Sequence, residues 1–220
     1  MVKPDPALRR LMRDTAKLLQ PYGFHGDEPR WVRIEAGGVA SVGRTRISRT
    51  WSAGQQVVGF GLYSSATPAA WWEFGNWRNA RMGLPPVPLE DATGPDLVDT
   101  GPPGGPEPVW SLRIDPDRPG GHALQHDIDT IRDELPRRVH AHARRALQLA
   151  DPGRYLDELL RQPDPRLGTW EAIVVLLAER GPGPDLEDAI GRLRQCFAGR
   201  EPSGYAHDII EFAQARALSA

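Results

Sequence analysis

Apolar residues spaced three and four positions apart mark the first predicted element. Between residues 5 and 20 they form one stripe, while Arg9 and Lys17 lie outside it. This spacing is typical of an amphipathic helix whose apolar side packs on a core. Asp5 can cap the helix, with Pro6 in its first turn. We therefore expect a helix over residues 5–20.

Short apolar runs bounded by glycine turns follow this helix. The predicted strands cover residues 31–36, 39–51, 55–64 and 109–114. Gly37-Gly38 is a hairpin signal, and Ser52-Ala53-Gly54 is a second turn. Strands joined by turns this short pair antiparallel. The pattern therefore predicts a four-stranded antiparallel sheet.

The remaining periodic segments are helical. Thr67 can cap a short helix that contains Trp71 and Trp72. Residues 122–150 form either one helix kinked at Pro136 or two helices, 122–135 and 136–150. The last part of the chain predicts short helices at residues 155–161, 169–179, 184–198 and 203–217. Together with the sheet, these segments predict an α+β fold with a helical C-terminal region.

Proline and glycine dominate residues 83–108, where apolar periodicity is lost. A loop of this length inside a compact domain is functional or mobile. We expect an α+β domain over residues 1–150 that carries this loop, and a helical extension over residues 151–220.

Composition places the chain among ordinary globular proteins. Hydrophobic residues make up 40% and charged residues 25% of the 220 residues, and the formal net charge is −2. A phosphate-backbone binder would be expected to be basic, so this charge disfavours nucleic acid. No apolar run approaches the about 18 residues of a membrane span, and the first ten residues lack a signal-peptide core. The abundance of arginine over lysine suggests a GC-rich bacterial genome, and we expect a cytoplasmic protein.

Candidate catalytic and metal-binding residues give weak signals. His122 and His126 have helical ligand spacing, but the glutamate of the metalloprotease motif is absent between them. His140 and His142 point in different directions on a helix. We interpret all four as solvated helix histidines and expect no metal and no cofactor.

Nucleophile and phosphate-binding motifs are also missing. Cys196, the single cysteine, lies in an apolar helical stretch and is expected to be an inert core thiol. No Gly-x-Ser-x-Gly elbow occurs. Residues 101–105 are rich in glycine but include prolines, and they lack the lysine of a phosphate loop. The catalytic residues therefore stay unknown, and we lean away from an enzyme.

Arginine and tryptophan concentrate between residues 31 and 81. Arg44 and Arg46 are two apart on a predicted strand and share a face, whereas Arg49 falls on the other face. Trp71 and Trp72 follow. This combination suits an anion or a protein partner. The alternative is structural, with tryptophans in the core and arginines paired to Glu35, Glu73 or Glu90-Asp91.

Part of the chain resembles a known bacterial family. A helix, Tyr22-Gly23-Phe24, a strand that opens with Trp31-Val32-Arg33, a glycine turn and two more strands are similar to domain of unknown function 4304. The similarity covers roughly residues 5–150. It implies an α+β domain with an antiparallel sheet, and it brings no catalytic residues.

These observations favour a non-catalytic protein-interaction or accessory protein. The candidate binding residues are Arg44, Arg46, Trp71 and Trp72. The partner expected is a protein, with a small anionic ligand as a second possibility and no membrane. The alternative is an enzyme that acts on a small anionic substrate bound by arginines. A weaker alternative is an RNA-binding module.

Overall fold

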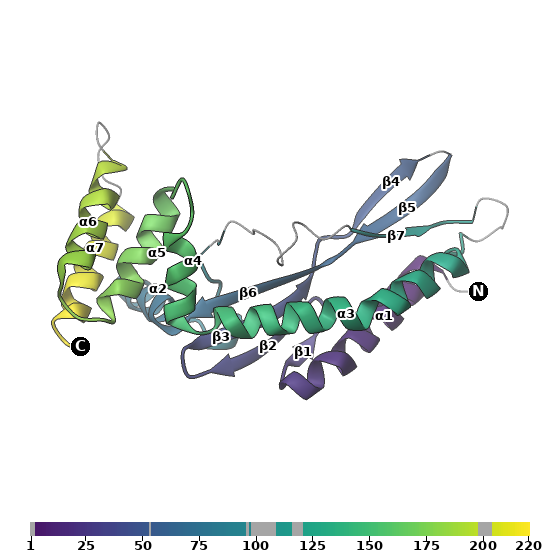
Figure 1. Ribbon diagram of the computed structural model, residues 1–220, viewed down its shortest axis with the longest axis horizontal. Coiled ribbons are helices and arrows are strands. Elements are labelled where there is room, and N and C mark those ends of the chain that lie inside the picture. Colours follow the sequence, from purple (N-terminus) through teal and green to yellow (C-terminus); the bar gives the residue numbers. More distant parts are fainter. Residues whose placement is uncertain (1–2, 53, 96, 98–108, 116–120, 198–203) are drawn as a thin grey trace. The chain divides into compact units, whose positions relative to one another are not determined.

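Two compact units make up the chain in the computed structural model (Figure 1). The structure describes residues 3–52, 54–95, 97, 109–115, 121–197 and 204–220. Unit 1 contains residues 1–33, 41–64 and 100–146, and unit 2 contains residues 34–40, 65–99 and 147–220. The domain boundary expected near residue 150 stays a prediction.

Helices cover most of the segments expected to be helical. Their bounds are α1 Pro4–Leu19, α2 Ala69–Arg81, α3 Gln125–Leu149, α4 Pro152–Leu160, α5 Leu167–Ala178, α6 Pro184–Gln195 and α7 Gly204–Ala217, with short 3-10 helices η1 Gln20–Tyr22 and η2 Leu89–Asp91. α3 runs through Pro136, whose exposed position on the helix leaves its ring in solvent. The alternative with one helix is therefore confirmed.

Seven strands form two sheets in the described residues. Their bounds are β1 His25–Asp27, β2 Arg30–Glu35, β3 Gly38–Arg44, β4 Ser48–Ser52, β5 Gln55–Phe60, β6 Leu62–Pro68 and β7 Trp110–Arg113. One sheet has the order β1-β2-β3-β6 and is antiparallel, and the other has the order β4-β5-β7. A four-stranded antiparallel sheet is present as expected, but the predicted strands are distributed over both sheets.

The strand predicted over residues 39–51 is interrupted. Residues 45–47 are not strand, so this segment leaves one sheet as β3 and enters the other as β4. The strand predicted over residues 55–64 is also interrupted, because Gly61, which lies beside Thr45, separates β5 from β6. Thr45 N–H donates to Gly61 O (2.9 Å), and Gly61 N–H donates to Thr45 Oγ1 (2.8 Å). These two hydrogen bonds join the chain segments at the point where both pass from one sheet to the other.

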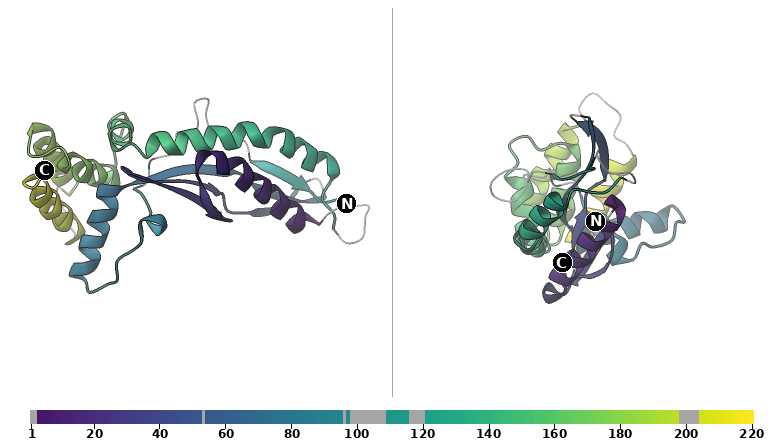
Figure 2. Two further views of the ribbon diagram at one scale, coloured as in Figure 1. Left: turned by 90° about the horizontal axis from the view of Figure 1, so that it is seen from below. Right: turned by 90° about the vertical axis from the view of Figure 1, so that its right-hand side faces the viewer.

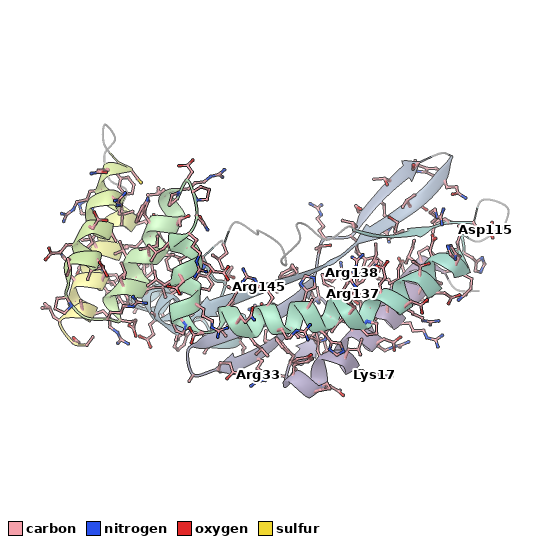
Figure 3. All side chains as sticks on the ribbon, in the orientation of Figure 1. Lys17, Arg33, Asp115, Arg137, Arg138 and Arg145 are labelled. Atoms are coloured by element: carbon pink, nitrogen blue, oxygen red, sulfur yellow. The ribbon has the colours of Figure 1, made fainter. Side chains whose placement is uncertain are left out.

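Unit 1 is built from two helices laid along strands. α1 and α3 run side by side (Figures 1 and 2), and Tyr22 at the end of η1 hydrogen-bonds His140 Nδ1 of α3 (3.0 Å). On β7, Trp110 and Leu112 are buried while Ser111 and Arg113 are exposed, as alternation requires. Arg138 of α3, labelled beside Arg137 in Figure 3, lies over the Trp110 ring at 4.4 Å.

Unit 2 has a helical core centred on α5. Seven consecutive residues of α5, Ala172–Ala178, are at most 5% exposed, so this helix is apolar on every side. Helices α4, α6 and α7 bury one face each around it, together with Phe74 of α2. A helix without a polar face must be enclosed by its neighbours. The helical character expected for the C-terminal region is confirmed.

Candidate functional site: an aromatic pocket in unit 2

The two predicted binding arginines lie in unit 1. Arg44 ends β3 and is half-buried, with its Nε–H donating to Glu28 Oε1 (2.6 Å). Arg46 is exposed and makes no hydrogen bond or ion pair with any described residue. Arg49 pairs with Asp5 (3.0 Å).

The argument that Arg44 and Arg46 share a strand face is wrong, because the strand stops before residue 45. Arg44 and Arg49 pair with Glu28 and Asp5, and not with the acidic residues expected for them.

The two predicted tryptophans lie in unit 2 and share a pocket. Trp71 and Trp72 are half-buried on α2 and line a cavity of about 370 Å³. The other walls come from α2 itself, from residues 87 and 91–93, and from Tyr205 of α7. This volume is within the range of about 300–1,000 Å³ that small-ligand sites occupy. The structure therefore brings Trp71 and Trp72 together at one site in unit 2, whereas Arg44 and Arg46 belong to unit 1.

The loop after α2 forms one wall because α2 binds its backbone. Val87 O accepts from Trp72 Nε1–H (2.6 Å) and from Asn76 Nδ2–H (3.1 Å), and Val87 N–H donates to Asn76 Oδ1 (2.7 Å). Trp72 and Asn76 are four residues apart and share a helix face. This described part of the loop predicted over residues 83–108 is therefore ordered against α2. Residues 96 and 98–108, including the glycines of residues 101–105, lie outside the described residues.

A second contact anchors the far end of this wall. Thr67, which was expected to cap α2, instead donates its hydroxyl to Ala92 O (3.2 Å), and Pro68 takes the cap position. Gly94 passes so close to β6 that a Cβ there would lie 2.2 Å from Ala66 O. Only glycine fits this approach.

An aromatic cluster supports the pocket from below. Phe74 is 1% exposed and contacts the rings of Trp71 (5.6 Å between centroids), Tyr205 (5.6 Å) and Phe212 (5.4 Å). Aromatic pairs at these separations and tilted angles are favourable beyond the area that they bury. The orientation of Trp71 and Tyr205 in the cavity wall is therefore held by packing.

The arginine in the pocket wall has a carboxylate partner. Arg78 Nε–H donates to Asp208 Oδ2 (3.1 Å), and its guanidinium lies 4.7 Å from the centre of the Tyr205 ring. Burial raises the pKa of Tyr205, and the charge of Glu171 adds to this, while Arg78 opposes it. Burial also raises the pKa of Glu171. Tyr205 therefore stays a neutral phenol at neutral pH and can donate a hydrogen bond to a ligand.

Gly75, Asn76 and Tyr205 are among the pocket residues that the sequence-based prediction did not include. A Cβ at Gly75 would meet no atom within 4 Å, so this residue opens the cavity floor. A glycine inside a helical pattern was a usable signal, as was the spacing of Asn76 after Trp72. Tyr205 could not be found, since 130 residues separate it from Gly75 in the sequence.

His122, His142 and Cys196 differ from expectation, whereas His126 is exposed on α3 as expected. His122 precedes α3, so it does not share a helix face with His126. His142 is 6% exposed and its Nδ1 lies 3.5 Å from Ser64 Oγ, so the solvated interpretation is wrong for it. Cys196 is exposed rather than buried, because α6 ends before it and Phe197 packs on the core instead.

Among the described residues, no group of three or more histidine, cysteine, aspartate or glutamate side chains is arranged to hold a metal ion. Within the same residues, every helix is too short or too polar to cross a membrane. No protein-family model, curated protein or solved structure matches the chain. The resemblance to domain of unknown function 4304 therefore stays a prediction.

Proposed function

We propose that the protein is a non-catalytic interaction protein whose aromatic pocket binds an apolar, extended segment of a partner protein. The observation that carries this proposal is the grouping of Trp71, Trp72 and Tyr205 around the open space at Gly75. Tryptophan and tyrosine dominate the residues that contribute most to binding energy at protein interfaces. Aromatic side chains whose orientation is already fixed by packing lose little conformational freedom on binding, and this favours affinity.

The loop wall indicates the chemistry of the partner. Residues 84–88, Leu-Pro-Pro-Val-Pro, lie on α2 with Val87 held by the Trp72 indole and the Asn76 amide. Pro88 has φ −57° and ψ 148°, close to polyproline II geometry. Aromatic-lined grooves recognise proline-rich segments in this conformation. We therefore expect the partner segment to be extended and to contain proline.

The arginines remain part of the proposal with a smaller role. Arg46 is exposed and uncompensated among the described residues, which supports the alternative of an enzyme acting on a small anionic substrate. Arg44 and Arg78 already have carboxylate partners, Glu28 and Asp208. The net charge of −2 gives no support to RNA binding. A cytoplasmic location in a bacterium is proposed on composition alone.

A pair of variants at Gly75 tests the pocket. Gly75→Leu places a side chain in the open space, whereas Gly75→Ala adds only a methyl group. Proline-containing peptides selected on the wild-type protein from a displayed library should bind Gly75→Ala equally well. They should lose at least about tenfold in affinity for Gly75→Leu, measured by fluorescence anisotropy.

Failure to select any peptide, or equal binding to Gly75→Leu, contradicts the proposal. An Arg46→Glu variant tests whether Arg46 contributes to binding. It should leave peptide binding unchanged if the pocket alone binds, and it should weaken binding if Arg46 takes part.

A further inference from the structure

β4 is an edge strand that is exposed along its whole length. All five residues, Ser48–Ser52, are exposed, and β4 is the outer member of the sheet β4-β5-β7 (Figure 1). Trp51 is 75% exposed. Exposed edges with large apolar side chains pair with other strands unless they are blocked. Neither proline nor a strand in the described residues blocks this edge.

The direction of the backbone groups on β4 follows from its neighbours. Ile114 N–H donates to Gln56 O (2.9 Å), so the backbone of Gln56 points toward the β7 side of β5. Backbone groups alternate along an antiparallel strand, so the next residue, Val57, points toward β4. Val57 is paired with Thr50. The N–H and C=O of Thr50 therefore face β5.

Alternation then places the free groups on the residues beside Thr50. Arg49 and Trp51 direct their backbone N–H and C=O away from β5, and no described residue hydrogen-bonds these groups. Being two apart, Arg49 and Trp51 also share one side-chain face. The open edge thus presents two sets of backbone donors and acceptors with an arginine and a tryptophan above them.

From this pattern we infer that β4 pairs antiparallel with β4 of a second copy of the chain, about a two-fold axis at Thr50. In this register Arg49 lies opposite Trp51 of the second copy, and each such pair exchanges both backbone hydrogen bonds. Thr50 faces Thr50, and Ser48 faces Ser52. The segment Ser-Arg-Thr-Trp-Ser is chemically self-complementary in this arrangement.

The side chains favour a second copy over an unrelated strand. An arginine opposite a tryptophan makes a cation–π contact, and threonine or serine pairs hydrogen-bond across strands. The charge of Arg49 is already accompanied by Asp5 (3.0 Å), so the two arginines do not repel strongly. A five-residue edge is small, so the dimer is weak and its fraction rises with protein concentration.

Cysteine crosslinking tests the register. In a non-hydrogen-bonded antiparallel pair the Cα atoms are about 4.5 Å apart, which a disulfide can bridge. Thr50→Cys should therefore give a covalent dimer on mild oxidation, in a Cys196→Ser background because Cys196 is exposed. Ser48→Cys is the matched control, since its two copies lie about 14 Å apart along the strands. Equal crosslinking of the two variants overturns the register.

Proline substitution tests the pairing itself. Trp51→Pro removes an N–H that points away from β5, so the ladder between β4 and β5 is preserved. Sedimentation velocity should show a concentration-dependent dimer for the wild type and only monomer for Trp51→Pro. Circular dichroism should show that the variant keeps its fold. A wild type that is monomeric at every concentration overturns the inference.

Discussion

Arginine–aromatic contacts occur in both units, but their surroundings differ. In unit 1, Arg138 lies over Trp110, and both residues are nearly buried, at 5% and 4% exposure. Glu134 accepts from the Trp110 indole (3.0 Å) and from Arg138 Nη2–H (2.7 Å). The ring and the cation are therefore enclosed, and of the three groups the carboxylate is the one that reaches solvent.

In unit 2 the same kind of contact faces solvent. Arg81 lies 4.6 Å from the centre of the Trp77 ring, and its side chain is 47% exposed. Arg78 over Tyr205 is 30% exposed and lines the cavity. Residue type alone therefore does not tell an enclosed arginine–aromatic contact from one that is open to solvent.

The largest difference between the units should appear when a ring is removed. Trp110→Ala leaves a cavity between β7 and α3 and should lower the free energy of unfolding by about 3–5 kcal/mol. Trp72→Ala removes a half-buried ring from a pocket wall and should lower the free energy of unfolding by clearly less. Urea unfolding of both variants measures the two free energies. A Trp72→Ala cost equal to that of Trp110→Ala would break the comparison.

Breaking an ion pair should also lower the free energy of unfolding more in unit 1 than in unit 2, but by a smaller amount. Asp127 is 6% exposed and accepts from Arg113 through its backbone N–H (2.8 Å) and its guanidinium. Asp127→Asn should cost about 1–2 kcal/mol of unfolding free energy, since Arg113 is half-exposed and partly screened. Glu211→Gln, which breaks the exposed pair with Arg81, should change little.

The pH dependence of this loss follows from the pKa of Asp127. Burial alone raises that pKa, but the hydrogen bonds and charge of Arg113 outweigh it, and the net direction is downward. A carboxyl whose pKa is lower in the folded state stabilises above its unfolded pKa, about 3.9. The difference between wild type and Asp127→Asn should be constant near neutral pH. It should shrink as pH falls through the folded pKa.

Removing the Asn76 side chain should loosen only the loop after α2 that forms one wall of the pocket. Asn76→Ala removes the paired hydrogen bonds to Val87 and should cost about 1 kcal/mol or less, because these groups are exposed. Hydrogen exchange at the Val87 amide should quicken, while exchange in α5 stays unchanged. Asn79→Ala is the control, since its contact with Pro85 O is long (3.5 Å).

The smallest effect is expected at the pocket floor. Gly75→Ala should raise the free energy of unfolding by roughly 0.5–1 kcal/mol, because alanine is the better helix former and its methyl meets open space. Thermal unfolding measures this change. A destabilised Gly75→Ala would mean that the floor is filled.

Helices were largely predictable because their signals are local. Proline and glycine at the breaks, with apolar spacing between them, located α1 and α4–α7 to within a few residues. The strand break at residues 45–47 was not predictable, since it depends on Thr45 meeting Gly61. That contact depends on how the strands pair in the folded protein, which the sequence of residues 45–47 does not indicate.

The candidate site was predictable only where its residues could be selected by local composition. Trp71 and Trp72 were selected by composition, and their shared pocket agrees with that choice without testing binding. Arg44 was selected as a surface cation, but its pairing with Glu28 depends on the tertiary structure. Tyr205 enters only because α7 packs on α2, which no local pattern indicates.

The enclosed helix α5 has a consequence for how the protein behaves when it unfolds. Residues 172–178, Ala-Ile-Val-Val-Leu-Leu-Ala, are uncharged, rich in β-branched residues and free of proline. Such segments assemble into intermolecular β-structure once they are exposed. Glu171 and Glu179 flank the segment as charged gatekeepers. We therefore expect the solubility of partly unfolded chains to depend on these two glutamates.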